Sequence, residues 1–181
     1  MKKLIFTMIM AALVCSAGMF SSCGSSDDDD NENEWVYDHT KDGIVGEWYS
    51  AGTDVAPIFK TPTFGNLDSL YAKFNADKTY RAEEFKEGKV PGNIYTGTYT
   101  QTKSSVGNIW IIHIDQTLPQ TGVSEGIFEI TKGTDGSYRM QYEIVQTHTG
   151  LIPATPEGGF GSSLNGAYGD ALIQKYVRLI K

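Results

Sequence analysis

The residues that could carry out acid–base chemistry are three histidines and a scattered set of carboxylates. His113 and Asp115 are two residues apart in a β-prone stretch, so they would share one face of a strand and could touch. A carboxylate can orient a histidine as a general base, but no serine, cysteine or threonine nucleophile motif accompanies this pair. The pattern favours a hydrogen-bonded surface pair over a catalytic one.

The sequence also lacks the patterns of a metal site, of a paired-carboxylate glycosidase site and of a phosphate-binding loop. His39, His113 and His148 have no second histidine or cysteine at metal-ligand spacing, so no metal site is predicted. Glu83 and Glu84 are adjacent on a predicted strand and would point to opposite faces, which argues against a paired-carboxylate site. No glycine-rich phosphate loop precedes a helix. We therefore predict a protein that is not an enzyme and that uses no cofactor.

Aromatic residues offer binding chemistry instead. The chain has ten tyrosines and three tryptophans, and Tyr95, Tyr99, Tyr138 and Tyr142 recur at alternate positions of two β-prone stretches. If these four side chains face inward, the interior is amphipathic and their hydroxyls need hydrogen-bond partners. They would then either bind a small apolar or aromatic ligand or form the core of the fold.

The elements that must position these residues are strands. Short runs rich in aromatic and β-branched residues alternate with clusters of Gly, Asn, Asp and Pro, and no helix of 10 or more residues is predicted after the N-terminal region. Polar turn sequences suggest that consecutive strands pair as hairpins. The predicted strands are residues 44–51, 67–75, 78–86, 94–103, 107–115, 126–132, 138–147 and 171–180.

Eight such strands predict an all-β domain over residues 35–181. An antiparallel up-and-down barrel is the expected architecture, because closure removes exposed strand edges, and a flattened β-sandwich is the alternative. Two connections are long, residues 52–66 and 148–170, and loops of this length are uncommon unless they are functional or disordered. Both could lie over a barrel mouth, or they could be ordinary surface excursions.

The first 22 residues have the order of a secretory signal peptide. Lys2 and Lys3 give a positive start, residues 4–14 are almost wholly apolar, and small residues follow. A membrane-spanning helix needs about 20 apolar residues, and this run is shorter and interrupted. We predict that residues 1–22 are a signal peptide.

Residues 20–24, FSSCG, resemble a bacterial lipobox, in which a cysteine after small residues receives lipid and becomes the mature N-terminus. The resemblance implies that Cys23 is lipidated and attaches the protein to a membrane. Cleavage before Cys23 would also remove Cys15, the other cysteine, so the mature chain could form no internal disulfide.

The residues after Cys23 are polar and acidic. Residues 23–34 contain six of the 22 acidic residues and are predicted to form a disordered tether. This patch resembles the surface-export signal of outer-membrane lipoproteins in one large group of Gram-negative gut bacteria; the alternative is a simple spacer. The resemblance implies a lipid anchor in the outer membrane with the protein on the cell surface, or otherwise on the periplasmic face.

Residues 35–181 hold 13 basic and 16 acidic residues without a basic cluster, which argues against nucleic-acid binding.

The stretch IVGEWY at 44–49 places Gly46 two residues before Trp48 and resembles the opening of the lipocalin-like (calycin) barrels. Residues 70–80 resemble a strand–turn–strand of lipocalin-like lipoproteins from the same bacteria, and the last predicted strand also fits. The resemblance implies that Arg178 packs across the indole of Trp48 and closes one end of the barrel, as a structural contact.

Two functions follow from these observations. The first is a surface lipoprotein whose barrel binds a small ligand. The second is a non-catalytic accessory subunit that contacts an outer-membrane protein partner through the outer barrel face or the loop over 148–170.

Overall fold

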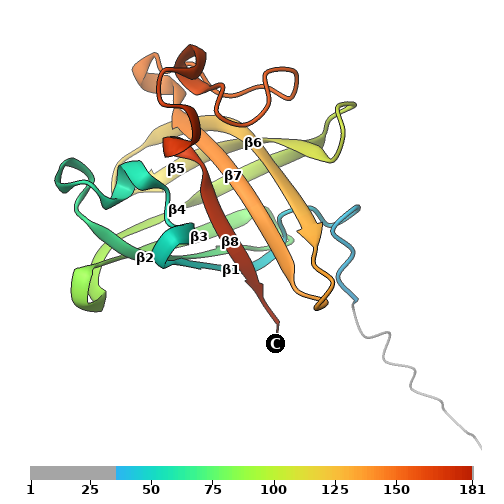
Figure 1. Cartoon of the computed structure of the whole chain (residues 1–181), viewed down its shortest axis with the longest axis horizontal. Coiled ribbons are helices and arrows are strands. Elements are labelled where there is room, and N and C mark those ends of the chain that lie inside the picture. Colours follow the sequence, from blue (N-terminus) through green and yellow to red (C-terminus); the bar gives the residue numbers. More distant parts are fainter. Residues whose placement is uncertain (1–35, 181) are drawn as a thin grey trace, which may run out of the picture. The chain divides into compact units, whose positions relative to one another are not determined.

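The computed structural model describes residues 36–180, which form an all-β domain. Its antiparallel strands follow one another around a closed barrel, in which each strand pairs with the next and β8 pairs with β1 (Figure 1). This topology confirms the predicted up-and-down barrel over the flattened sandwich. The strands are β1 (Gly46–Ala51), β2 (Leu67–Phe74), β3 (Thr79–Lys86), β4 (Val90–Lys103), β5 (Ile109–Leu118), β6 (Gly122–Lys132), β7 (Tyr138–Gln146) and β8 (Gln174–Leu179).

All eight predicted strands are present, with differences at their ends. The largest differences are at the starts of β4 and β6, each four residues earlier than predicted. These starts are not recognisable in the sequence, because they contain Pro91, Gly92 and Gly122. Proline and glycine usually interrupt strands. The signal peptide, Cys23 and the tether lie outside the described residues. Within residues 36–180, no helix is long and apolar enough to cross a membrane.

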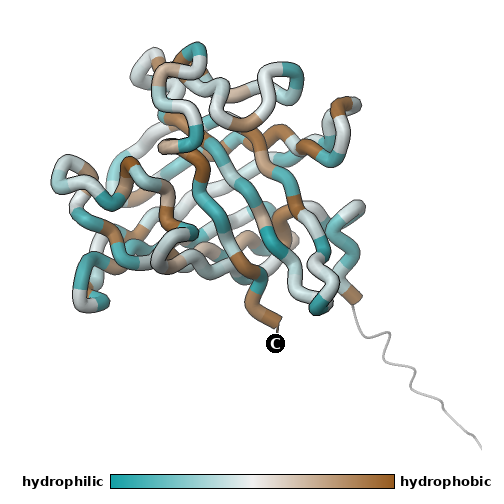
Figure 2. Tube along the Cα trace, viewed as in Figure 1, coloured by the Kyte–Doolittle hydropathy of each residue, from teal (hydrophilic) through white to brown (hydrophobic). Residues whose placement is uncertain are grey.

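The barrel interior is filled by large side chains. Apolar and polar residues alternate along the strands (Figure 2), so one face of each strand supplies the core. The rings pack at specific angles: Phe74 meets Tyr99 edge-on with centroids 5.1 Å apart, and Trp110 stacks on Phe128 at 5.8 Å. The fully buried side chains of this core include those of Trp48, Tyr99, Ile112, Phe128 and Met140.

Two inward-facing glycines allow the sheet to bend into a ring. A Cβ atom on Gly97 of β4 would lie 2.0 Å from the carbonyl oxygen of Asp115 on β5. A Cβ atom on Gly126 of β6 would lie at the same distance from the carbonyl oxygen of Glu143 on β7. Any larger residue would force the neighbouring backbone apart, so glycine is required where the strands approach this closely.

One end of the barrel is closed by residues 36–45. Ile44 is fully buried there, and its backbone N–H donates to Oε1 of Gln101 at 2.9 Å. The Gln101 Nε2 donates in turn to the carbonyl of Asp42 at 2.9 Å. The Tyr37 ring lies in the same closure, and its hydroxyl donates to a main-chain carbonyl of the segment at 2.6 Å. We call this the closed end.

The two long loops lie at the other end, away from the C terminus (Figure 1). Both are ordered by short 3₁₀ turns, and they pack against each other through η2 and η7. The turns are η1 (Gly52–Asp54), η2 (Pro57–Lys60), η3 (Pro62–Phe64), η4 (Glu87–Lys89), η5 (Thr147–Thr149), η6 (Ser163–Gly166) and η7 (Gly169–Leu172).

A buried carboxylate fastens the longer loop to the outside of the barrel. Glu143 of β7 pairs with Ile127 of β6 on the outward face, yet both side chains are completely buried. The Glu143 carboxylate accepts the backbone N–H of Gly161 at 2.6 Å and that of Ser163 at 3.1 Å. These hydrogen bonds satisfy a charge that would be costly to bury alone.

Candidate functional site

The barrel end opposite the closed end, which we call the mouth, is lined by residues from every strand. Strand register identifies them, because directly paired residues share a face. Leu70 pairs with Glu84, and Ala82 pairs with Tyr95, while Leu70, Ala82 and Tyr95 all pack against the core. The inward-facing residues at the mouth are Ser50, Leu70, Ala82, Glu84, Tyr95, Gln116, Ser124, Ile144, Gln146 and Gln174.

Three tyrosines lie below this ring and form what we call the tyrosine floor: Tyr80 of β3, Tyr142 of β7 and Tyr176 of β8. They are 7%, 9% and 6% exposed. Tyr142 meets Tyr176 edge-on, with centroids 6.1 Å apart. Burial raises the pKa of Tyr80 to about 12, and burial together with the nearby Tyr176 and Tyr80 raises the pKa of Tyr142. All three are therefore neutral hydroxyl groups at physiological pH.

The hydroxyls of the tyrosine floor have no hydrogen-bond partner within residues 36–180. Among the described residues, Arg178 Nε is the one side-chain nitrogen or oxygen that is both fully buried and without a partner. The three tyrosine hydroxyls have no partner, so they are not fully buried. Each hydroxyl therefore faces a space that a water molecule can occupy. A buried hydroxyl normally has a partner, so these groups are available to water or to a ligand.

A carboxylate projects into the mouth above the floor. Glu84 lies at a β-bulge between β3 and β4, where the register shifts between Glu83 and Phe85. Its Oε1 accepts the hydroxyl of Tyr95 at 2.6 Å, and its Oε2 accepts the backbone N–H of Asn93 at 3.2 Å. Burial and this hydrogen bond to Glu84 raise the pKa of Tyr95.

One side of the mouth is covered. Gln174 of β8 is almost fully buried, and its Nε2 donates to the Ser50 hydroxyl and to the carbonyl of Asp54. Its Oε1 accepts the backbone N–H of Ala56 at 2.8 Å. The loop over 52–66 is thereby fixed across the β1–β8 side.

The structure brings two of the four predicted ligand-binding tyrosines together at the mouth. Tyr95 and Tyr142 are there, whereas Tyr99 donates its hydroxyl to the carbonyl of Asn75 at 2.8 Å, beyond the floor. Tyr138 is at the closed end, edge-on to Tyr37 with centroids 5.0 Å apart. All four belong to the core or pack against it.

Sequence reasoning missed Tyr80, Tyr176 and Glu84 as mouth residues. The alternation of Tyr80, Ala82 and Glu84 along β3 was a usable signal for one shared face. The position of Tyr176 across the barrel from β3 could not be predicted, because it depends on how the strands close into a barrel. The expectation that Glu83 and Glu84 point to opposite faces agrees with their contacts: Glu83 accepts Nε of the exposed Arg81 at 2.7 Å.

The residues of the calycin-like signature meet at the closed end. Trp48 and Arg178 are direct partners across the β1–β8 ladder, and the indole Nε1 of Trp48 donates to the carbonyl of Ile44 at 2.7 Å. The aromatic ring over which the Arg178 guanidinium lies is that of Tyr37, at 3.7 Å from the centroid, whereas Trp48 was the expected ring. A Cβ atom on Gly46 would lie 2.9 Å from Nε of Arg178, so the glycine makes room for the guanidinium.

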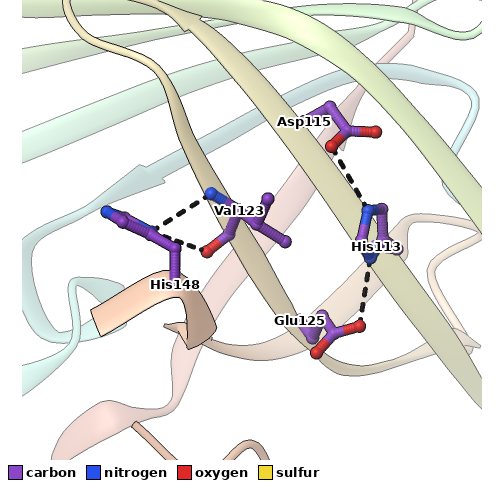
Figure 3. A network of polar contacts seen from close by, with 5 residues as sticks. All are labelled: His113, Asp115, Val123, Glu125 and His148. Atoms are coloured by element: carbon purple, nitrogen blue, oxygen red, sulfur yellow. Dashed lines mark hydrogen bonds and ion pairs between the residues drawn. The ribbon is translucent and has the colours of Figure 1, made fainter. Parts of the chain in front are cut away.

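The histidine network lies on the outer face of β5 and β6 (Figure 3). His113 contacts Glu125 at 3.1 Å and Asp115 at 3.4 Å, as the sequence suggested for the Asp115 pair. The hydrogen bond with Glu125, supported by Asp115, raises the pKa of His113. His148 contacts the backbone of Val123 instead. No group of three or more potential metal ligands occurs within residues 36–180.

Two shallow hollows lie outside the barrel, over β7 and β8. The first, of about 220 Å³, is lined by strand residues including Arg139 and Lys175 and by Asp54 of the first long loop. The second, of about 300 Å³, shares Lys175 and adds Phe160 of the second long loop. Both are at or below the usual size of small-molecule sites.

No family model, curated protein or solved structure matched this sequence. The architecture is that of a β-barrel binding module, and more specific statements about function depend on the residues of the mouth.

Proposed function

We propose that this protein is a non-catalytic binding module that holds a small ligand with an apolar or aromatic body in the mouth of its barrel. The observation that carries the proposal is the tyrosine floor: three neutral hydroxyls without protein partners, each facing a space that water can enter. The aromatic ring faces provide apolar contact area for a ligand, and the hydroxyls orient it through hydrogen bonds.

The composition of the mouth supports binding rather than catalysis. Its inward-facing residues include one carboxylate and no histidine, cysteine or lysine among the described strands, so a nucleophile paired with a base is not assembled there. The His113 pair is on the outer face, away from the mouth.

Thermal unfolding with a panel of fatty acids, bile acids, porphyrins, glycans and small aromatic probes tests the proposal. A probe at one hundred times its Kd should raise the unfolding free energy by about 2.7 kcal/mol. Ala82→Phe should abolish this effect by filling the mouth, whereas Thr100→Phe, on the exposed face of β4, should retain it. If no probe class stabilises the protein, the binding function is wrong.

We further propose that the binding module is anchored to the outer membrane through lipid on Cys23 and is exposed on the cell surface. The lipobox-like sequence and the acidic tether support this location. The described domain begins at Val36, directly before Tyr37 of the closed end. Cys23→Ala should release the protein from membranes, and replacement of residues 27–30 by alanine should lower its protease accessibility on intact cells.

An interaction subunit is the second candidate, and a specific observation favours it. Large apolar side chains are exposed on the loops and strand ends at the mouth side, including Phe64, Val90, Leu118, Ile152 and Tyr168. Exposed apolar residues gathered on one side of a protein can mark a contact surface. Crosslinking from these positions on intact cells should capture an outer-membrane protein only if this second function is correct.

A further inference from the structure

We propose that the mouth selects organic cations, that is, amines or quaternary ammonium groups attached to an apolar body. This inference rests on the proposed binding function and specifies its ligand class. It is carried by the position of Glu84 above the tyrosine floor.

Glu84 is the one charged side chain among the inward-facing residues of the mouth. The bulge and Gly92 hold it in place, since a Cβ atom on Gly92 would lie 2.9 Å from Cβ of Glu84. Tyr95 and Asn93 each occupy one lone pair on a different carboxylate oxygen, which leaves a further lone pair on each oxygen for a ligand. A positioned, partly buried carboxylate interacts with a cation more strongly than an exposed one does.

The tyrosine floor suits the same ligand. The face of a tyrosine ring attracts a cation, and a hydroxyl without a partner can accept a hydrogen bond from an ammonium group. Tyr142 and Tyr176 are set edge-on to each other, so their ring faces do not cover one another.

Anionic ligands find no counter-charge inside the mouth. The basic residues nearest Glu84 along the chain are Lys86, Arg81 and Lys89, and Nε of Arg81 is paired with Glu83 on the outer face. The Lys86 side chain runs against Gly65 of the first long loop, and Lys89 is exposed. A carboxylate ligand would therefore meet Glu84 without a compensating cation, and like charges at short distance repel.

Isothermal titration of the purified full chain with three probes of similar shape tests the inference. The probes are 2-phenylethylamine, 2-phenylethanol and 3-phenylpropanoate, which are cationic, neutral and anionic at pH 7. We expect the amine to bind about tenfold more tightly than the alcohol, and the carboxylate to bind most weakly. This ranking is measured on the unmodified protein, so it does not depend on any variant folding.

Two matched variants locate the effect. Glu84→Gln should reduce the preference for the amine over the alcohol to about threefold or less, because the charge is removed while the shape is kept. Glu83→Gln changes the adjacent carboxylate on the outer face and should leave the preference unchanged.

The outcomes separate this inference from the proposed function. Equal binding of amine and alcohol, or tighter binding of the carboxylate, would overturn cation selectivity and leave the binding function standing. A preference for the amine that persists in Glu84→Gln would also overturn it. Absence of binding by all three probes, together with no stabilisation by the wider panel, would refute both.

Discussion

Replacement of Glu143 by alanine should release the long loop from the outer face of the barrel. This carboxylate is completely buried and accepts two backbone N–H groups, from Gly161 and Ser163. In the alanine variant these two donors lose their side-chain acceptor. The variant thus removes an attachment of the loop while the strands of the barrel remain paired.

The magnitude follows from these two contacts. A hydrogen bond to a charged group contributes about 1.5–3 kcal/mol, and part of that gain offsets the cost of burying the carboxylate. We therefore expect Glu143→Ala to lower the unfolding free energy by about 2–4 kcal/mol, a substantial fraction of the roughly 5–15 kcal/mol that stabilises a typical domain. Glu143→Gln keeps one acceptor oxygen and should have about half that effect.

Urea unfolding, followed by the fluorescence of the buried Trp48 and Trp110, measures the free energy. Amide hydrogen exchange should show faster exchange at Gly161 and Ser163 in the alanine variant. Glu157→Ala is the matched control, since Glu157 is in the same loop but exposed.

A change of less than about 0.5 kcal/mol in Glu143→Ala, comparable to an ordinary surface substitution, would refute the assigned role. Unchanged exchange at both amides would refute it independently, because the loop would then be held by other contacts.

Three further changes test other parts of the fold. Gly97→Ala should lower the unfolding free energy by about 2 kcal/mol or more in urea unfolding, because its Cβ would overlap a carbonyl oxygen of the next strand. Arg178→Met should lower it by about 1 kcal/mol through loss of the guanidinium contact with Tyr37, and an unchanged value would contradict that contact. In an NMR titration, His113 should have a pKa above the ordinary value near 6.5, and Glu125→Gln should lower that pKa. The raised pKa means that this pair stabilises the fold below the ordinary pKa and ceases to do so as the pH rises through the raised one.

The fold was predictable because its strands obey local rules. Tyr95, Gly97 and Tyr99 were expected on one face, and they do face the interior. The early starts of β4 and β6 were not predictable, because pairing with a neighbouring strand keeps proline and glycine in the sheet there. Local propensity contains no information about such neighbours.

The candidate site was predictable only in part. Tyr95 and Tyr142 were identified from alternation, but alternation does not say how deep along the barrel axis a residue lies. Tyr99 therefore could not be distinguished from them, although it lies beyond the floor. Alternation along β3 places Glu84 on the inward face, but its contacts with Tyr95 and Asn93 depend on a β-bulge. A bulge depends on the register of two strands, which no single stretch of sequence specifies.

The pairing of β1 with β8 has a consequence for how the protein is made. Trp48 and Arg178 face each other in the ladder although nearly the whole domain separates them in the chain. The ring cannot close before β8 is available, and contacts of such high sequence separation form slowly. Until then β1 and β7 each present an unpaired edge, the kind of surface on which unfinished chains aggregate. Folding of this protein therefore requires that its first strand be kept from other chains until its last strand is available.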